Sequence, residues 1–151
     1  VLYKGFYGDC AYTFPIGEIS EESKKIVRIT KECLQKGIEM AVVGKRLGDV
    51  SYAIQEHAEK NGCSVVRELV GHGIGKKLHE DPEVPNYGKR GKGEKLVPGL
   101  VIAIEPMVND GGDEIVLAKD DFTYKTKDGE HSAHFEKTIV ITENGHEILT
   151  P

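Results

Sequence analysis

The sequence lacks the features that mark secreted, membrane-spanning and nucleic-acid-binding proteins. Its 151 residues include three scattered cysteines and no CxxC pair, so we expect no disulfide framework and predict a reducing, cytoplasmic environment. No apolar run approaches the roughly 18 residues that a transmembrane helix requires. The 25 acidic residues outnumber the 20 basic ones, and this net charge of −5 argues against direct nucleic-acid binding.

Several common catalytic motifs are missing as well. The chain contains neither a GxSxG nucleophile elbow nor a phosphate-binding P-loop. The segment that begins His79-Glu80 is not HExxH, because Glu83 stands where the second histidine would be, so a zincin helix is excluded. Cys10, beside Asp9, leaves a cysteine hydrolase open as an alternative.

What is present suits one domain over residues 1–151. Hydrophobic residues make up 38% of the chain and charged residues 30%, which is typical of a globular protein with a core. The chain opens on Val1 within a β-type run, without a start methionine or a signal-peptide pattern. We therefore expect a chain that begins inside a larger domain.

The residue pattern predicts two amphipathic helices and several short strands. Ser20 is a good N-cap for a first helix that we expect to stop at Gly37, and a second helix is expected over residues 46–60. Residues 1–16 resemble two strands, and a loop is expected around Pro82 and Pro85. The other predicted strands are 65–66, 100–108, 114–118, 122–126, 135–142 and 147–150. This combination indicates an α+β fold.

Two glutamates lie in segments that read as buried strands. Glu105 and Glu136 have apolar neighbours, and a buried carboxylate costs several kcal/mol unless it is paired or bound to a metal. The alternatives are that each points outward or pairs with a lysine. His72, His79 and an early aspartate complete a set of oxygen and imidazole donors that suits Mn²⁺, Fe²⁺, Co²⁺ or Zn²⁺ and, with bridging carboxylates, a two-metal site. A lone histidine is more often a surface residue.

Four motifs together resemble type I, bacterial-like methionine aminopeptidases. They are GHGIG at 71–75, HEDP at 79–82, IEPM at 104–107 and SAHFE at 132–136, and the resemblance extends over residues 5–150. It implies a pita-bread fold with its N-terminal portion missing and a site for two divalent ions, Co, Mn, Fe, Zn or Ni. It also implies removal of the initiator methionine from nascent chains when a small residue follows.

The resemblance also implies roles for individual residues. Asp9, His72, Glu105 and Glu136 match the metal ligands, and Glu105 is in addition expected to accept the proton of the attacking water. His79 matches a catalytic histidine that hydrogen-bonds the substrate. Leu78 and Phe122 match positions that line the methionine pocket.

The sequence departs from the family pattern in several places. A further metal-binding aspartate of the family would fall before Val1, and we therefore expect the isolated 151 residues to be inactive. Cys10 replaces a small hydroxyl residue, His134 stands where a glutamine is common, and Lys137 where a histidine is common.

Two other functions remain open. A prolidase or Xaa-Pro aminopeptidase would share the ligands, although Pro106-Met107 after Glu105 favours the methionine enzyme. A non-catalytic pita-bread module would bind a partner such as a ribosome or RNA. For the methionine enzyme, the expected partner is the N-terminus of a nascent polypeptide, with ribosome association as an open possibility, no membrane contact and a monomeric parent protein.

Overall fold

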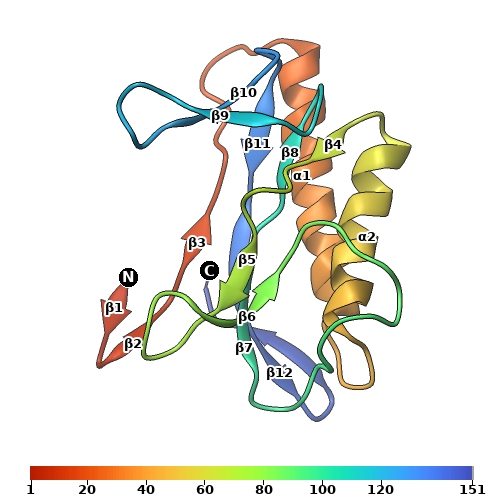
Figure 1. Ribbon diagram of the computed structural model, residues 1–151, viewed down its shortest axis with the longest axis vertical. Helices are drawn as coiled ribbons and strands as arrows, with labels where there is room; N and C mark the ends of the chain where they lie inside the picture. Colours follow the sequence, from red (N-terminus) through yellow and green to blue (C-terminus); the bar gives the residue numbers. More distant parts are fainter. Residues whose placement is uncertain (151) are drawn as a thin grey trace.

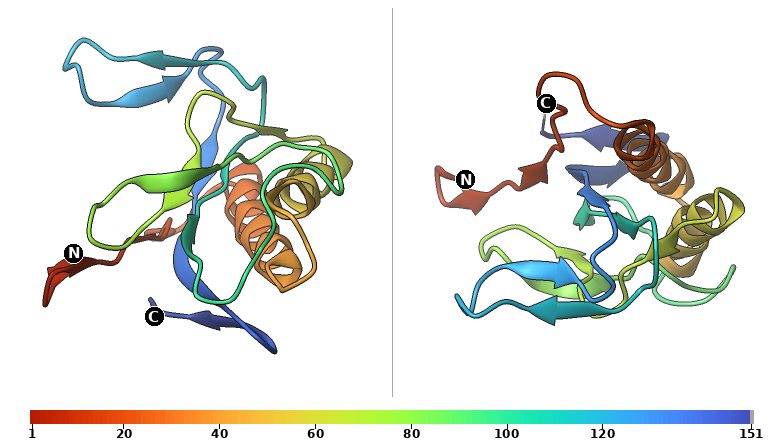
Figure 2. Two further views of the ribbon diagram at one scale, coloured as in Figure 1. Left: turned by 60° about the horizontal axis from the view of Figure 1, so that its bottom comes forward. Right: turned by 90° about the horizontal axis from the view of Figure 1, so that it is seen from above.

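Two helices cover one face of a curved antiparallel sheet in the computed structural model, which describes residues 1–150 (Figure 1). Helix α1 (Glu21–Met40) and helix α2 (Leu47–Lys60) pack side by side, and α1 also contacts strands of the sheet. The opposite side of the sheet carries loops and short strands, as Figure 2 shows from above. No helix in residues 1–150 combines the length and apolar character needed to cross a membrane.

The largest sheet has the strand order β13-β12-β7-β5-β6, with β3 pairing on β12. All of its pairings are antiparallel, and the helices lie on one face, so the predicted α+β class is confirmed. Its strands are β3 (Cys10–Ala11), β5 (Gly71–Gly73), β6 (Glu80–Val84), β7 (Val101–Ile104), β12 (Glu136–Thr142) and β13 (Gly145–Ile148).

Three smaller sheets extend this framework. The order β11-β8-β4 forms a three-stranded sheet, in which β8 directly follows β7 in the chain and β11 directly precedes β12. The β9-β10 hairpin projects from the body of the molecule, and β1-β2 forms a hairpin near the N-terminus (Figure 2). These strands are β1 (Leu2–Tyr3), β2 (Phe6–Tyr7), β4 (Ser64–Val65), β8 (Met107–Asn109), β9 (Ile115–Leu117), β10 (Tyr124–Thr126) and β11 (Ser132–His134).

The core lies between the helices and the sheet. Both predicted helical stripes are buried, and they pack with apolar residues of β7 and β12 in one cluster. Ser20 caps α1 as predicted, because its hydroxyl accepts a hydrogen bond from the Ser23 amide at 3.1 Å. The buried stripe residues are Ile26, Ile29, Cys33, Leu34 and Ile38 in α1 and Leu47, Val50, Ile54 and Ala58 in α2.

The predicted stop of the first helix at Gly37 is wrong, because α1 continues to Met40. Gly37 is buried where the two helices approach each other. A Cβ atom at this position would stand 2.9 Å from Cδ1 of Ile54 and 3.3 Å from Cγ2 of Ile104. The glycine therefore permits close helix packing instead of ending the helix.

We predict that Gly37→Leu lowers the free energy of unfolding by about 2–3 kcal/mol, because the added side chain overfills this contact. Urea denaturation followed by circular dichroism measures the change. Gln35→Leu, at an exposed position of the same helix, is the control and should change it by less than about 0.5 kcal/mol. Equal effects of the two substitutions would contradict this account of Gly37.

Two strand predictions and one loop prediction also need correction. Residues 1–16 contain three short strands instead of two, and the segment 100–108 is divided into β7 and β8 at Glu105-Pro106, where proline has no amide proton for the ladder. The loop expected around Pro82 begins instead as strand β6. This strand forms the edge of the sheet and carries a bulge, so Pro82 is tolerated there.

Candidate metal centre

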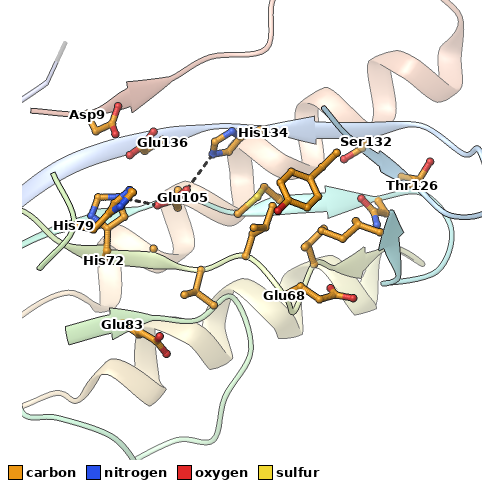
Figure 3. Close-up of a pocket in the computed structure, with 18 of the residues that line it drawn as sticks. Asp9, Glu68, His72, His79, Glu83, Glu105, Thr126, Ser132, His134 and Glu136 are labelled. Carbon is orange, nitrogen blue, oxygen red and sulfur yellow. Dashed lines mark ion pairs between the residues drawn. The ribbon is translucent and has the colours of Figure 1, made fainter. Parts of the chain in front are cut away.

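The residues predicted to bind metal or to act in catalysis meet in one cavity of about 1480 Å³. Its lining includes Asp9, His72, His79, Glu105 and Glu136, which come from segments far apart in the sequence. Figure 3 shows Glu105 between two imidazoles, with Asp9 and Glu136 beside it. The sheet therefore brings all five predicted metal-binding and catalytic residues together.

Glu105 lies at the centre of this cluster, immediately after β7. Its Oε1 is 3.4 Å from Nε2 of His72, and its Oε2 is 3.7 Å from Nε2 of His134 (Figure 3). The side chain is 14% exposed and pairs with no lysine among the described residues. Asn86 donates a hydrogen bond to the Glu105 carbonyl at 3.3 Å, which holds the backbone where β7 ends. Of the alternatives open from the sequence, an outward or lysine-paired Glu105 is excluded.

Glu136 is the first residue of β12 and is 4% exposed. It sits opposite Ala11 of β3, and this pairing brings Asp9 next to it. The Asp9 amide donates to the hydroxyl of Thr138 at 3.0 Å, and this hydroxyl donates to the Asp9 carbonyl at 2.8 Å. Thr138 therefore fixes the Asp9 backbone to β12, two residues along the chain from Glu136.

His72 is positioned by the central strand β5, where it lies opposite Ala103 of β7. Its Nδ1 is 2.9 Å from the Gly73 carbonyl, so a proton on Nδ1 leaves the Nε2 lone pair facing Glu105. Such a bond to the second ring nitrogen is the usual way in which proteins orient a metal-binding histidine. His79 packs with its ring edge-to-face on His72, at a centroid distance of 4.5 Å.

Burial and mutual repulsion dominate the electrostatics of the carboxylates. Burial, followed by the negative charges of Glu136 and Asp9, raises the pKa of Glu105 to about 8. Burial and then Asp9 raise the pKa of Glu136 to about 7. Burial also lowers the pKa of His134 from its ordinary value, which favours the neutral imidazole that binds metals. A cation among these groups would offset both the burial and the repulsion.

The donor set fits divalent metal ions. The structure contains two groups of three residues whose donor atoms lie within 4.8 Å of one another inside each group. The first group is Asp9, His72 and Glu136, and the second is Glu105, His134 and Glu136. Oε1 of Glu105, Nε2 of His134 and Oε1 of Glu136 are buried and have no hydrogen-bond partner among the described residues. Buried polar atoms are rarely left unpaired in proteins, and metal coordination would satisfy all three. Glu136 belongs to both groups.

His134 is the site residue that the sequence-based ligand set left out. It precedes Glu136 by two residues in an extended segment, so strand alternation places both side chains on the same face. This two-residue spacing from Glu136 is the sequence feature that could have pointed to His134. Leu78 and Phe122 are not among the residues that line the cavity, and Phe122 is 86% exposed in the β9-β10 hairpin, so their contact with methionine stays a prediction.

Comparison with known proteins identifies the family. A family model described as metallopeptidase family M24 matches residues 1–143. The chain belongs to this family. Its sequence is 55% identical to the methionine aminopeptidase of Clostridium acetobutylicum over 149 residues, which are 99% of this chain and 60% of that protein. Methionine aminopeptidase 1 of Bacillus subtilis is 51% identical over 146 residues, 97% of this chain and 59% of that protein.

Solved structures of similar proteins have the same architecture. The methionine aminopeptidase of Thermotoga maritima superimposes with a TM-score of 0.96 and 53% identity, over 99% of this chain and 60% of that one. The prolidase of Pyrococcus furiosus gives a TM-score of 0.74 and 26% identity, over 99% of this chain and 39% of that one. The pita-bread fold and the resemblance to methionine aminopeptidases are thus confirmed, and the chain spans about 60% of the length of these aminopeptidases.

Membership of a metallopeptidase family agrees with the donor cluster. The family accounts for divalent metal binding, and the cluster shows where this chain offers ligands.

Proposed function

We propose that this chain contributes the metal centre of a methionine aminopeptidase, which hydrolyses the bond after an N-terminal methionine. The observation that carries the proposal is the convergence of Asp9, His72, Glu105 and Glu136 in one cavity. The high identity to methionine aminopeptidases over almost the whole chain supports the same activity. The proposed partner is the N-terminus of a newly made polypeptide whose second residue is small, and the proposed location is the cytoplasm.

In this proposal the four side chains would hold two divalent ions, to which His72 would offer an imidazole and Asp9, Glu105 and Glu136 would offer carboxylates. When bound, such ions supply a water molecule of lowered pKa and polarise the peptide carbonyl. Mn²⁺, Fe²⁺, Co²⁺, Ni²⁺ and Zn²⁺ all suit the mixture of carboxylate and imidazole donors. The acidic cavity also attracts the positively charged α-amino group that every peptide N-terminus carries.

Two residues are proposed to move or hold protons. Glu105 accepts the proton of the attacking water and returns it to the leaving amine, because its carboxylate lies at the centre of the cluster. His79, whose ring packs on that of His72, is proposed to donate a hydrogen bond to the substrate amide.

The activity of the 151 residues alone is a separate matter. Because the chain spans about 60% of its relatives' length, we propose that it hydrolyses peptides far more slowly than a whole relative does. The test joins residues 1–151 to the remaining segment of the Clostridium acetobutylicum enzyme and compares this chimera with the chain alone. With Mn²⁺ or Co²⁺ present, we expect Met-Gly-type peptides to be cleaved by the chimera at least about 100-fold faster.

The same assay separates the alternative functions. The similarity to prolidases favours an Xaa-Pro peptidase as the second candidate. Faster cleavage of Xaa-Pro peptides than of Met-Ala peptides by the chimera would overturn the methionine assignment in favour of this candidate. Metal binding without cleavage of either peptide would indicate a non-catalytic module. A chimera that carries Glu136→Ala is the control and should be inactive.

A further inference from the structure

We propose that Thr138 is a positioning residue of the metal centre: its hydroxyl holds Asp9 in place and thereby sets the affinity of the centre for its ions. This inference rests on the metal centre of the proposed function and extends it to a residue that does not line the cavity. It starts from a junction in the sheet, where strand β12 exchanges one edge partner for another beside the candidate ligands.

Thr138 lies at this junction and is 1% exposed. Lys137 pairs with Ile104 of β7 on one edge of β12 and with Cys10 of β3 on the other. The edge that β3 occupies at residues 136–137 is occupied by β13 at residues 139–142. The register of β3 places Asp9 opposite Thr138, so this candidate ligand lies where the chain that forms β3 meets the sheet.

The backbone of Thr138 is bonded to the C-terminal segment that follows β13. The amide of Leu149 donates to the Thr138 carbonyl at 2.9 Å, and the Thr138 amide donates to the hydroxyl of Thr150 at 3.0 Å. In a continuing antiparallel ladder that carbonyl would be the acceptor for the Asp9 amide. The Thr138 hydroxyl serves instead, since it accepts from the Asp9 amide at 3.0 Å and donates to the Asp9 carbonyl at 2.8 Å.

The other end of the pairing between β3 and β12 has the same arrangement. Thr13 falls opposite His134 in the register that pairs Ala11 with Glu136. The Thr13 hydroxyl accepts from the His134 amide at 3.0 Å and donates to the His134 carbonyl at 2.7 Å. The ladder itself contains only two residue pairs, so the two hydroxyls supply a large share of the bonds that fix this segment to β12.

The position of the Asp9 backbone matters because a metal site tolerates little displacement of its ligands, about 0.5 Å. Donor atoms of Asp9, His72 and Glu136 lie within 4.8 Å of one another, and Figure 3 shows Asp9 beside Glu136. Oδ1 of Asp9 also accepts a hydrogen bond from the Cys10 amide at 3.1 Å, so the carboxylate is tied to its own backbone. Loss of the Thr138 hydroxyl should therefore displace the carboxylate and weaken metal binding while every ligand is retained.

Substitutions of Thr138 in the 151-residue chain test the proposal without an activity assay. Thr138→Val keeps the shape of the side chain and removes the hydroxyl, whereas Thr138→Ser keeps the hydroxyl. Calorimetry with Mn²⁺, at a temperature at which circular dichroism shows each variant folded, gives the affinities. Amide hydrogen exchange of the metal-free chain reports how firmly the Asp9 amide is bonded.

We expect Thr138→Val to weaken Mn²⁺ binding by at least about 10-fold, the lower end of the effect of partners that orient metal ligands. Exchange of the Asp9 amide should become faster in the same variant, because this amide loses its acceptor. Thr138→Ser should restore the affinity to within about 3-fold of the unsubstituted chain. Thr142→Val, in the same strand and outside the cavity, is the matched control and should leave affinity and exchange unchanged.

The outcomes separate this inference from the proposed function. If the unsubstituted chain binds Mn²⁺ and Glu136→Ala abolishes binding, the metal centre stands. Unchanged affinity in Thr138→Val, even with a lower Tm, or an equal loss in Thr138→Ser would then overturn the positioning role alone. Mn²⁺ binding that survives Glu136→Ala, or no binding by a folded unsubstituted chain, would overturn both.

The exchange measurement keeps the test decisive if Thr138→Val does not fold. In the unsubstituted chain the Asp9 amide should exchange slowly, because the buried Thr138 hydroxyl accepts its hydrogen bond. Exchange as fast as that of the exposed residues 143–144 would show that this hydroxyl does not hold Asp9, and would overturn the proposal.

Discussion

Glu136→Gln is expected to stabilise the metal-free chain at pH 8 and to remove most of the stabilisation that metal provides. Glu136 is 4% exposed, and burial with the neighbouring Asp9 raises its pKa to about 7. A metal-free chain must therefore bury an unfavourable charge once this carboxyl ionises. Glutamine has nearly the same shape and no charge, so it avoids this cost but cannot bridge two ions.

The sign of the pH dependence follows from the raised pKa. A carboxyl whose pKa is higher in the folded than in the unfolded state, near 4.5, favours folding while it is protonated. This contribution is complete below the unfolded pKa and is lost as the pH rises through about 7. Glu105, whose pKa is raised to about 8, has the same effect. The metal-free chain should thus lose stability between pH 5 and pH 8, and Glu136→Gln should lose on the order of 1–3 kcal/mol less.

Metal binding should make the unsubstituted chain more stable than Glu136→Gln. At a free Mn²⁺ concentration about 100 times the dissociation constant, the unsubstituted chain should gain about 2.7 kcal/mol, whereas Glu136→Gln should gain almost nothing. Urea denaturation at pH 5 and pH 8, with and without Mn²⁺, measures all four values. Glu143→Gln, in the exposed turn between β12 and β13, is the matched control and should behave like the unsubstituted chain. A Glu136→Gln chain that Mn²⁺ stabilises as strongly as the original would refute the bridging role.

The second large effect is expected from Gly71→Ala. Gly71 lies in the central strand β5, between β6 and β7. A Cβ atom here would collide with the carbonyl oxygen of Ala103, and it would stand 3.1 Å from Cβ of Val84. Backbone atoms of two paired strands cannot move aside as a flexible side chain can. We therefore expect a loss of about 3 kcal/mol or more in the free energy of unfolding.

This substitution should also impair metal binding, because Gly71 directly precedes His72 and a displaced β5 would move the imidazole away from Glu105. Thermal denaturation and Zn²⁺ calorimetry measure the two effects. Gly112→Ala is the control, since the nearest atom to its added Cβ would be Oδ2 of Asp128 at 3.5 Å, an ordinary contact. Normal stability and normal zinc binding in Gly71→Ala would show that the strands accommodate a methyl group here.

The local sequence pattern was sufficient to predict a structural feature where that feature depends on one segment of the chain alone. The apolar stripes of α1 and α2 follow the period of the helix, and both are buried as predicted. Glu105 and Glu136 were identified as candidate site residues because burying a carboxylate among apolar neighbours costs free energy. Both lie in the cluster. The resemblance of the four motifs to methionine aminopeptidases identified the family and the set of residues that the sheet brings together.

Pattern failed where a contact between distant segments decides the outcome. Glycine often ends a helix, and Gly37 was predicted to do so. In the structure Ile54 of the next helix approaches Gly37 closely, so this glycine serves helix packing instead. Proline is typical of loops, and a loop was predicted around Pro82. In the structure Pro82 lies in strand β6, which tolerates proline because it is an edge strand with a bulge. No local feature distinguishes these cases, because the partner atoms come from elsewhere in the chain.

The sequence by itself predicted the α+β class, the two helices, the family and the candidate metal ligands Asp9, His72, Glu105 and Glu136. Only the tertiary structure showed that these residues meet in one cavity and that His134 lies beside Glu105. The reason is that residue type and local period set which face a side chain occupies. Strand order and register, by contrast, set which faces meet, and here the pairing of β12 with both β3 and β7 creates the cluster.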